Sequence, residues 1–253
     1  MKSIFFTILF ASVFCMGCNS DDKGSTSQNP DPTNPTPTNP NPTDPTPTNP
    51  NAIRYIALGD SYTIGQNVCE TCRFPAQLKA ALSAQTMREV NLEIIATTGW
   101  TTTNLISAIS SNDPDSNHDL VTLLIGVNNQ YQHKPFSVYQ QEFPQLVNTA
   151  ISLAQGDKDN VIVVSIPDYA YTPYGQGSSP EYQAIISSEI DQYNAFAQSY
   201  CETNGIVFVD ITDITRQGLM YPSLVASDGL HPSESAYASF VERLLPKAII
   251  AVE

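Results

Sequence analysis

The chain has 253 residues and is strongly acidic, with 25 Asp and Glu against 11 Lys and Arg and a formal net charge of −14 at pH 7. A surface of this charge repels phosphate backbones and anionic lipid head groups, which argues against a nucleic-acid-binding protein and against membrane binding by charge attraction. The first fifty residues lack the composition of a domain. About two hundred residues therefore remain for a single core.

The N-terminus, residues 1–17, has the layout of a secretory signal peptide. Lys2 precedes a largely apolar run from Ile4 to Phe14, and the small residue Gly17 stands directly before Cys18. The run is shorter than the about 20 residues that a membrane-spanning helix requires. We therefore predict a cleaved signal here and no transmembrane helix.

The residues CMGC at positions 15–18 resemble the lipobox of bacterial lipoproteins, in which the cysteine after the cleavage site is acylated. The resemblance implies lipidation of Cys18, and a lipid-anchored protein lies on a membrane without spanning it. Cys15 stands where a lipobox usually has leucine, so a plain secreted protein is the alternative. We expect a protein of the bacterial cell envelope, anchored by its lipid on the periplasmic or outer surface.

Residues 18–51 are predicted to be a disordered linker behind the lipidated cysteine. From Asn29 to Asn51 the chain repeats Pro, Thr and Asn and offers no apolar side chain to bury. Such sequences favour extended polyproline II geometry at about 3 Å per residue. The linker would hold the domain predicted for residues 52–253 away from the membrane.

From Ile53 onward, apolar runs alternate with amphipathic stretches. The runs predict strands at about Tyr55–Leu58, Leu92–Ala96, Val121–Ile125, Val161–Ile166 and Ile206–Val209. The stretches between and after them predict helices at Phe74–Gln85, Thr102–Ser110, Phe136–Gln155, Pro180–Thr203 and Ser233–Ala251. Nearly continuous β-branched runs are typical of parallel strands covered on both faces. The alternation predicts an α/β three-layer sandwich with a five-stranded parallel sheet.

The distinctive polar sequences follow the predicted strands directly. They read ALGDS, ATTGW, LIGVNNQ, SIPDYAYTPYG and VDITDITRQG, in chain order. The carboxyl ends of parallel strands share one edge of the sheet, where ligands of such folds bind. We therefore expect the functional site at this edge.

Ser61, at the end of the first predicted strand, is the candidate nucleophile. A nucleophilic serine needs a base and a group that orients the base, and the chain has three histidines. His118 is expected to be a surface residue at the opposite edge, and His133 lies at the right edge without a nearby acid. His231 lies three residues after Asp228, a spacing that can bring the carboxylate to one ring nitrogen. Each segment is in isolation also an ordinary turn sequence.

Four short blocks together resemble the SGNH (GDSL) hydrolase family. They are GDS at 59–61, Gly99 in ATTGW, GVNN at 126–129 and DGLHP at 228–232, in the family's order and spacing. The resemblance covers Ile53 to Val252. It implies an esterase or lipase with a flavodoxin-like sheet, in agreement with the architecture predicted above.

The resemblance also implies a role for each site residue. Ser61 would be the nucleophile, His231 the general base and Asp228 its orienting partner. The oxyanion hole would consist of the backbone N–H groups of Ser61 and Gly99 and the side-chain amide of Asn128. No cofactor and no metal ion is implied.

Two polar residues beside the predicted site need a separate interpretation. Asn129 stands where the family usually has aspartate, which leaves the packing and hydrogen bonding around the third block open. Asp60 precedes the nucleophile and is interpreted as a structural acceptor within the turn.

With Cys15 removed and Cys18 acylated, three thiols remain. Cys69 and Cys72 form CETC. The additional ligands of a zinc site and the thioredoxin-like context of a redox motif are not visible in the sequence, so a local disulfide is predicted. Cys201, on a predicted helix, is expected to be a buried thiol.

The loop after the fourth strand, PDYAYTPYGQGSSPEY, contains four tyrosines that could stack on sugars, bound an acyl pocket or pack on one another. The main hypothesis is an esterase that removes a short acyl group, such as acetyl, from a carbohydrate or another small ester. The alternatives are a lipase, lysophospholipase or thioesterase for longer chains, and a non-catalytic glycan-binding lipoprotein. We expect a monomer whose membrane contact is its lipid anchor.

Overall fold

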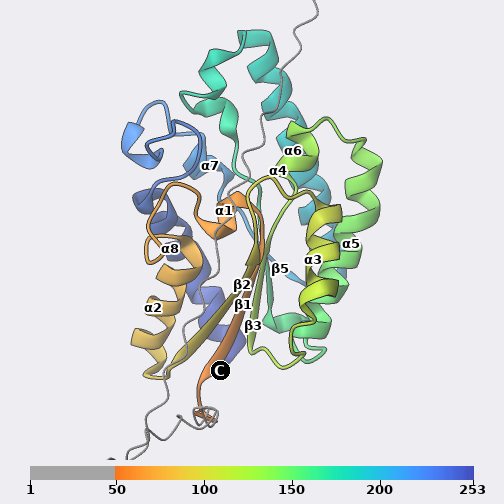
Figure 1. The fold of residues 1–253 in the computed structure, drawn as a ribbon, viewed down its shortest axis with the longest axis vertical. Coiled ribbons are helices and arrows are strands. Elements are labelled where there is room, and N and C mark those ends of the chain that lie inside the picture. Colours follow the sequence, from red (N-terminus) through yellow and green to blue (C-terminus); the bar gives the residue numbers. More distant parts are fainter. Residues whose placement is uncertain (1–48) are drawn as a thin grey trace, which may run out of the picture. The chain divides into compact units, whose positions relative to one another are not determined.

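The computed structural model describes residues 49–253, and these residues contain a parallel sheet with helices on both faces (Figure 1). The five strands have the order β2-β1-β3-β4-β5. Their bounds are Ile53–Gly59 for β1, Val90–Ala96 for β2, Leu120–Leu124 for β3, Val161–Val164 for β4 and Val207–Val209 for β5. The predicted α/β three-layer architecture is confirmed. The signal peptide, Cys18 and nearly all of the predicted linker lie outside the described residues.

The first two strands begin earlier than the sequence predicts. β1 starts at Ile53 and β2 at Val90, each two residues before the expected position. Arg54 in β1 and Asn91 in β2 are exposed and interrupt the apolar pattern. Because β2 is an edge strand, polar side chains are tolerated there and hide the strand from a hydrophobicity argument.

The long helices form the two outer layers. Figure 1 shows α2 and α8 on one face of the sheet and α3, α5 and α6 on the other. Their bounds are Phe74–Thr86 for α2, Thr102–Asn112 for α3, Phe136–Leu153 for α5, Pro180–Asn204 for α6 and Glu234–Val252 for α8. These agree with the predictions to within one or two residues at each end.

Three very short helices were not predicted, and each directly follows a strand or nearly so. They are α1 at Ser61–Ile64 after β1, α4 at Val127–Tyr131 after β3 and α7 at Thr212–Thr215 after β5. One helical turn is too short to show a hydrophobic period, so no pattern in the sequence reports it. Short 3-10 helices also occur at Lys158–Asn160, Tyr169–Tyr171, Gly175–Gly177 and Pro222–Leu224.

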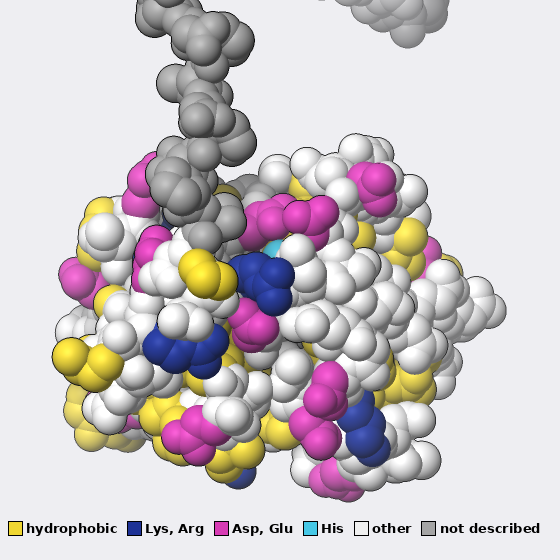
Figure 2. All heavy atoms as spheres, turned by 90° about the horizontal axis from the view of Figure 1, so that it is seen from below, with side chains coloured by type: hydrophobic (Ala, Val, Ile, Leu, Met, Phe, Trp, Pro, Cys, Tyr) yellow, Lys and Arg dark blue, Asp and Glu magenta, His cyan; other side chains and the backbone are white. Residues whose placement is uncertain are grey.

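The end of the molecule opposite the strand carboxyl ends carries acidic and basic side chains side by side (Figure 2). Arg54 pairs there with Asp119 at 3.5 Å. The expectation that His118 is a surface residue is wrong. It lies at this end, but only 4% of it is exposed, because its loop packs against the end of α5 and its Nε2 lies 3.5 Å from Glu93 Oε2.

Within residues 49–253, we find no helix with the length and apolar character that crossing a membrane requires.

Candidate functional site

The register of the sheet brings the ends of β1, β2 and β3 together. Gly59 at the end of β1 lies opposite Ala96 of β2 and opposite Leu124 of β3. The segments that follow these ends hold three predicted site residues: Ser61, Gly99 and Asn128. Parallel pairing therefore gathers at one edge three groups that are far apart in the sequence.

Ser61 is the first residue of α1 and is 4% exposed. Asp60 caps this helix, and its Oδ1 accepts a hydrogen bond from the backbone N–H of Tyr62 at 3.0 Å. The turn needs glycine at position 59, because a Cβ there would lie 2.1 Å from Thr63 Oγ1. The cap and the glycine together hold the serine at the end of the central strand.

Asp60 has the geometry of a structural acceptor, as its place in the sequence predicts. Its Oδ2 is buried and has no hydrogen-bond partner among residues 49–253. Burial raises the pKa of this carboxyl from 3.8 to about 7. The raised pKa shifts this carboxyl towards its neutral form, so near neutral pH the average negative charge beside Ser61 is reduced.

Asp228 and His231 form a close pair in the loop before α8. His231 Nδ1 lies 2.6 Å from Asp228 Oδ2, and the other carboxylate oxygen accepts the backbone N–H groups of Leu230 and His231 at 3.0 and 3.1 Å. Partial burial acts to raise the pKa of Asp228, but the hydrogen bonds from His231, the two backbone N–H groups and Asn67 outweigh it and lower the pKa to about 2. The charged carboxylate therefore holds the imidazole with its proton on Nδ1, which leaves Nε2 free to accept a proton.

The acid–base pair lies beside the serine segment. The ring centroids of His231 and Tyr62, the residue after Ser61, are 5.6 Å apart. In the described part of the chain, no hydrogen bond joins the Ser61 hydroxyl to the imidazole of His231. Such bonds are often long without substrate and tighten when it binds.

Asn128 lies in α4 and reaches back to the segment after β2. Its Nδ2 donates to the carbonyl oxygen of Trp100 at 3.0 Å. An amide carries two hydrogens, so one remains for an oxyanion. Gly99, next to Trp100, has a φ of +85°, and its carbonyl oxygen accepts from Gln132 Nε2 at 2.9 Å. These contacts bring the two predicted oxyanion donors that follow β2 and β3 together.

Asn129 is fully buried, and both the oxygen and the nitrogen of its side-chain amide form hydrogen bonds. Its Oδ1 accepts the backbone N–H of Thr102 at 2.9 Å, and its Nδ2 donates to Thr102 Oγ1 at 2.7 Å. The Thr102 hydroxyl in turn donates to Glu142. Position 129 therefore carries an amide, and the carboxylate of this hydrogen-bonded chain is that of Glu142 on α5, beyond Thr102.

A hollow of about 690 Å³ lies beside the end of α4, and four of the nine residues that line it are tyrosines. Tyr131, at the end of α4, and Tyr174, from the tyrosine-rich loop, are each about half exposed, and their hydroxyls are 2.7 Å apart. The backbone N–H of Tyr174 donates to the carbonyl oxygen of Gly229 at 2.8 Å. This bond ties the tyrosine-rich loop, which lines the hollow, to the segment between Asp228 and His231. His133 lines the hollow as well.

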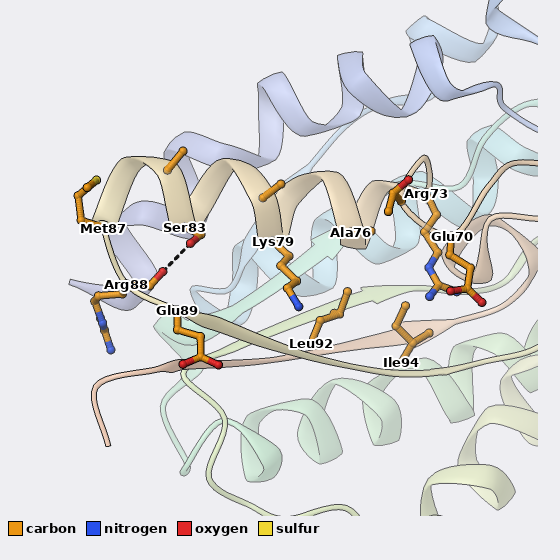
Figure 3. Close-up of a pocket in the computed structure, with 13 residues that line it drawn as sticks. Glu70, Arg73, Ala76, Lys79, Ser83, Met87, Arg88, Glu89, Leu92 and Ile94 are labelled. Carbon is orange, nitrogen blue, oxygen red and sulfur yellow. Dashed lines mark hydrogen bonds between the residues drawn. The ribbon is translucent and has the colours of Figure 1, made fainter. Parts of the chain in front are cut away.

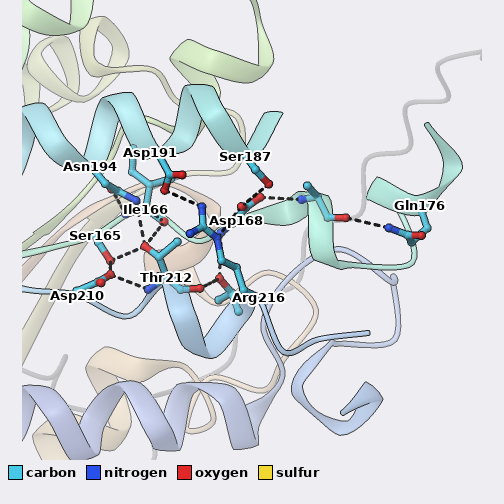
Figure 4. Close-up of polar contacts among 12 residues, drawn as sticks. Ser165, Ile166, Asp168, Gln176, Ser187, Asp191, Asn194, Asp210, Thr212 and Arg216 are labelled. Atoms are coloured by element: carbon cyan, nitrogen blue, oxygen red, sulfur yellow. Dashed lines mark hydrogen bonds and ion pairs between the residues drawn. The ribbon is translucent and has the colours of Figure 1, made fainter. Parts of the chain in front are cut away.

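A network of ion pairs and hydrogen bonds around the buried Asp168 anchors the tyrosine-rich loop (Figure 4). Asp168 is fully buried, and its Oδ2 accepts from Ser187 Oγ at 2.7 Å and from Arg216 Nε at 3.0 Å. Arg216 also donates to Asp191 at 2.7 Å. The loop that forms one wall of the hollow is thus tied to α6 and to the residue after α7. The sequence did not predict this network, because its members are distant in the chain.

A second hollow, of about 1000 Å³, lies between α2 and β2, away from the acid–base pair (Figure 3). Its lining combines aliphatic residues with Arg73, Lys79 and Arg88. Among its lining residues there is no serine, histidine and carboxylate arrangement of the kind formed at the strand ends. We therefore assign the chemistry to the strand ends.

The cysteines of the structure have two different environments. Cys69 and Cys72 are joined by a disulfide bond, and Cys201 is a buried free thiol. Within the described part of the chain, no group of three or more His, Cys, Asp or Glu side chains is arranged to hold a metal ion.

The sequence pattern of the GDSL-like Lipase/Acylhydrolase family matches residues 57–238, which include all four blocks of the predicted site. The chain belongs to this family. The family is one of hydrolases, so the protein is a hydrolase enzyme, as the resemblance implied. A sequence comparison with curated proteins gave no match.

Solved structures of lipolytic proteins and esterases share the fold. A lipase from a goat rumen metagenome superposes with a TM-score of 0.61 at 19% identity, covering 78% of this chain and 98% of that one. A member of the lipolytic G-D-S-L family from Veillonella parvula gives 0.58 at 18%, covering 77% and 97%. An acetylxylan esterase from Geobacillus stearothermophilus gives 0.53 at 20%, covering 78% and 94%. At these identities the likeness concerns the fold.

Proposed function

We propose that the protein is a serine esterase that acts through an acyl-serine intermediate on short acyl esters of carbohydrates. One observation carries the proposal. The Asp228–His231 pair, 2.6 Å apart, leaves Nε2 of the imidazole free at the sheet edge where Ser61 begins α1. A charged acid, an oriented base and a serine at a strand end are the parts that nucleophilic acyl transfer needs.

In the proposed reaction, Ser61 Oγ attacks the ester carbonyl carbon while His231 Nε2 takes the hydroxyl proton. The tetrahedral oxyanion is held by the N–H groups of Ser61 and Gly99 and by the free N–H of Asn128. Collapse breaks the bond to the alcohol oxygen, which receives the proton from His231. Water then attacks the acyl-serine with the same base and releases the acid and the free serine.

The tyrosine hollow supports a carbohydrate as the alcohol part of the substrate. A tyrosine offers an aromatic face to the C–H side of a sugar and a hydroxyl to its polar edge. Tyr131 and Tyr174 line the hollow side by side, each about half exposed, with their hydroxyls 2.7 Å apart. Among the residues that line the hollow, the aliphatic side chains are those of Pro173 and Ile186. A long acyl chain would need a larger apolar surface to become buried.

The test is turnover of p-nitrophenyl esters from acetate to palmitate, together with acetate release from an acetylated xylan. We expect the highest kcat/KM on the shortest esters and no turnover by Ser61→Ala. A preference for long chains would support the lipase or thioesterase alternative. If the wild type, like Ser61→Ala, hydrolyses no ester, the catalytic proposal is wrong. The glycan-binding alternative is then favoured.

We also propose that the protein is attached to a bacterial membrane by a lipid on Cys18. The CMGC sequence supports this, and so does the Pro-, Thr- and Asn-rich stretch that separates Cys18 from the domain. The linker would let the domain reach substrates beyond the membrane surface.

A further inference from the structure

We propose that the disulfide loop, residues 65–73, which contains the Cys69–Cys72 bond, positions Asp228 for catalysis through the side chain of Asn67. The inference rests on the proposed function, because the acid–base pair that it concerns is the one assigned there.

The contact joins the serine segment to the acid. Asn67, three residues after the end of α1, donates from Nδ2 to Asp228 Oδ2, a residue 161 positions further along the chain. The same oxygen lies 2.6 Å from His231 Nδ1. Asp228 Oδ2 therefore has two side-chain donors, and Oδ1 has two backbone donors. With four donors, the carboxylate has a defined plane, and that plane sets the direction of the imidazole.

The residue type at position 67 suits this task. Its φ is +63°, a left-handed conformation that asparagine tolerates better than most residues other than glycine. Its amide is a neutral donor, so it fixes the carboxylate without adding a positive charge that would compete with the imidazole. The short side chain also has few torsions to immobilise.

The disulfide loop is closed on itself. The Cys69–Cys72 bond holds the two Cα atoms 4.9 Å apart, and the N–H of Cys72 donates to the carbonyl of Cys69 at 2.9 Å. At the entrance, Gly65 packs so closely on Arg73 that a Cβ would lie 2.4 Å from the Arg73 Cβ. The loop thus begins and ends at the same place and keeps a fixed shape between.

The disulfide loop is also fastened to the other side of the acid–base segment. Gln77 Nε2 donates to the carbonyl oxygen of Cys72 and, at 3.1 Å, to that of Glu234, three residues beyond His231. Asn67 itself is exposed. An exposed amide on a free loop would exchange its partner for water. The disulfide, which begins two residues after Asn67, and the packing of Gly65 on Arg73 limit the freedom of this loop and so favour the Asn67–Asp228 bond.

The main test is Asn67→Gly, which removes the amide and tolerates the left-handed backbone. Loss of an outer hydrogen-bond partner typically costs about 10–100-fold in metal sites, and we expect kcat for p-nitrophenyl acetate to fall about tenfold with little change in KM. Asp113→Gly is the matched control, since Asp113 is exposed and left-handed at the end of α3 (φ +45°). It should keep the wild-type kcat.

Asn67→Asp gives a readout that a merely structural role would not move. Two adjacent carboxylates share a proton at low pH and repel each other when both are ionised. The kcat/KM of this variant relative to wild type should fall as pH rises, whereas that of Asn67→Gly should be flat. Wild-type kcat and an unchanged pH profile in both variants would refute the positioning role.

The part played by the disulfide is tested by combining variants. Replacing both cysteines, Cys69→Ser with Cys72→Ser, should lower kcat in wild type, and it should cause no further loss in Asn67→Gly. Effects that act through the same contact are non-additive in this way. Additive losses would show that the disulfide does not act through Asn67.

If the proposed function is wrong, the wild type will show no turnover that depends on Ser61. The positioning role of Asn67 can still be tested in that case, by ¹³C NMR titration of the Asp228 carboxyl. Asn67→Gly should raise the pKa of Asp228 from about 2 towards its ordinary value. An unchanged titration would overturn the inference whatever the protein's activity.

Discussion

At the scale of single residues, the role proposed for Asn128, that of an oxyanion donor, depends on how its side-chain amide is fixed. One of its amide hydrogens is used by the Trp100 carbonyl, 3.0 Å away, which fixes the plane of the amide and directs the other. A donor fixed in advance stabilises the charge that develops in the transition state without reorganising.

Asn128→Ala is expected to lower kcat about 10²–10³-fold with a small effect on KM, because the lost hydrogen bond forms in the transition state. Steady-state kinetics on p-nitrophenyl acetate measures this. Asn148→Ala, an exposed change on α5, is the control and should behave as wild type. A rise in KM with unchanged kcat would mean that Asn128 binds substrate and does not act as an oxyanion donor.

The raised pKa of Asp60 predicts how the free energy of unfolding changes with pH. Its pKa is about 7 in the folded protein against an ordinary 3.8, so between these values the folded state holds a proton that the unfolded state has lost. This group therefore lowers the free energy of unfolding as pH rises from about 4 to about 7. Asp60→Asn keeps the acceptor for Tyr62 and removes the titration.

Thermal unfolding of wild type and Asp60→Asn over this pH range provides the measurement. The melting temperature of wild type should decrease relative to that of the variant as pH rises, and the difference should level off above about pH 7. A difference that does not change with pH would show that Asp60 is not protonated in the folded protein.

The residue scale also shows what the sequence could and could not reveal. Ser61, Asp228 and His231 were predicted because each is at a strand or helix boundary in a short, distinctive block. Asn67 and Asp168 were missed, because their partners are distant in the chain and nothing nearby marks them. Local patterns report local structure, whereas such contacts depend on the completed fold.

At the scale of elements, α3, α4 and α5 are joined by a chain of hydrogen bonds from Asn129 through Thr102 to Glu142. The Thr102 hydroxyl has one proton, and Glu142 accepts it. The amide at position 129 can donate to that hydroxyl, and a carboxylate cannot. The departure from the family's usual aspartate is therefore matched by Glu142.

Asn129→Asp should destabilise the protein by about 1–3 kcal/mol, because a buried carboxylate oxygen would face a hydroxyl whose proton is already used. Adding Glu142→Gln supplies an amide donor and should restore much of this loss. Urea denaturation of the two single variants and the double variant gives the coupling. If the double variant loses as much free energy of unfolding as the two single variants together, Glu142 does not compensate for the amide at position 129.

The elements differ in how well the sequence predicted them. The five long helices were found because each spans several periods of its hydrophobic pattern, and the five strands were found because each contains a nearly continuous apolar run. The one-turn helices α1 and α4 were not found, although they carry Ser61 and Asn128. The site thus depends on the elements that periodicity detects least, and the polar blocks located it instead.

At the scale of the whole molecule, the family match and the described domain account for the region from residue 57 to 238. The N-terminal region lies outside the described residues, and its role as signal, lipid site and linker stays a prediction. This prediction can be tested with the two cysteines of CMGC, because Cys18 is expected to be acylated and Cys15 to be removed with the signal peptide.

Cys18→Ala should move the protein from the membrane fraction to the soluble fraction of an expressing bacterium, because the acylated residue is lost. Cys15→Ala is the matched control and should remain with the membrane. Fractionation followed by immunoblotting, with metabolic labelling by a fatty acid analogue, measures both. Membrane association that persists in Cys18→Ala would contradict the lipid anchor.

The most direct test of the catalytic assignment is covalent labelling of Ser61 by a p-nitrophenyl phosphonate, followed by intact mass measurement and peptide mapping. We predict a single adduct on Ser61, none on Ser61→Ala, and much slower labelling of His231→Ala, because the base that activates the serine is gone. Labelling at another residue, or labelling of Ser61→Ala at the wild-type rate, would contradict the assignment of Ser61 as the nucleophile.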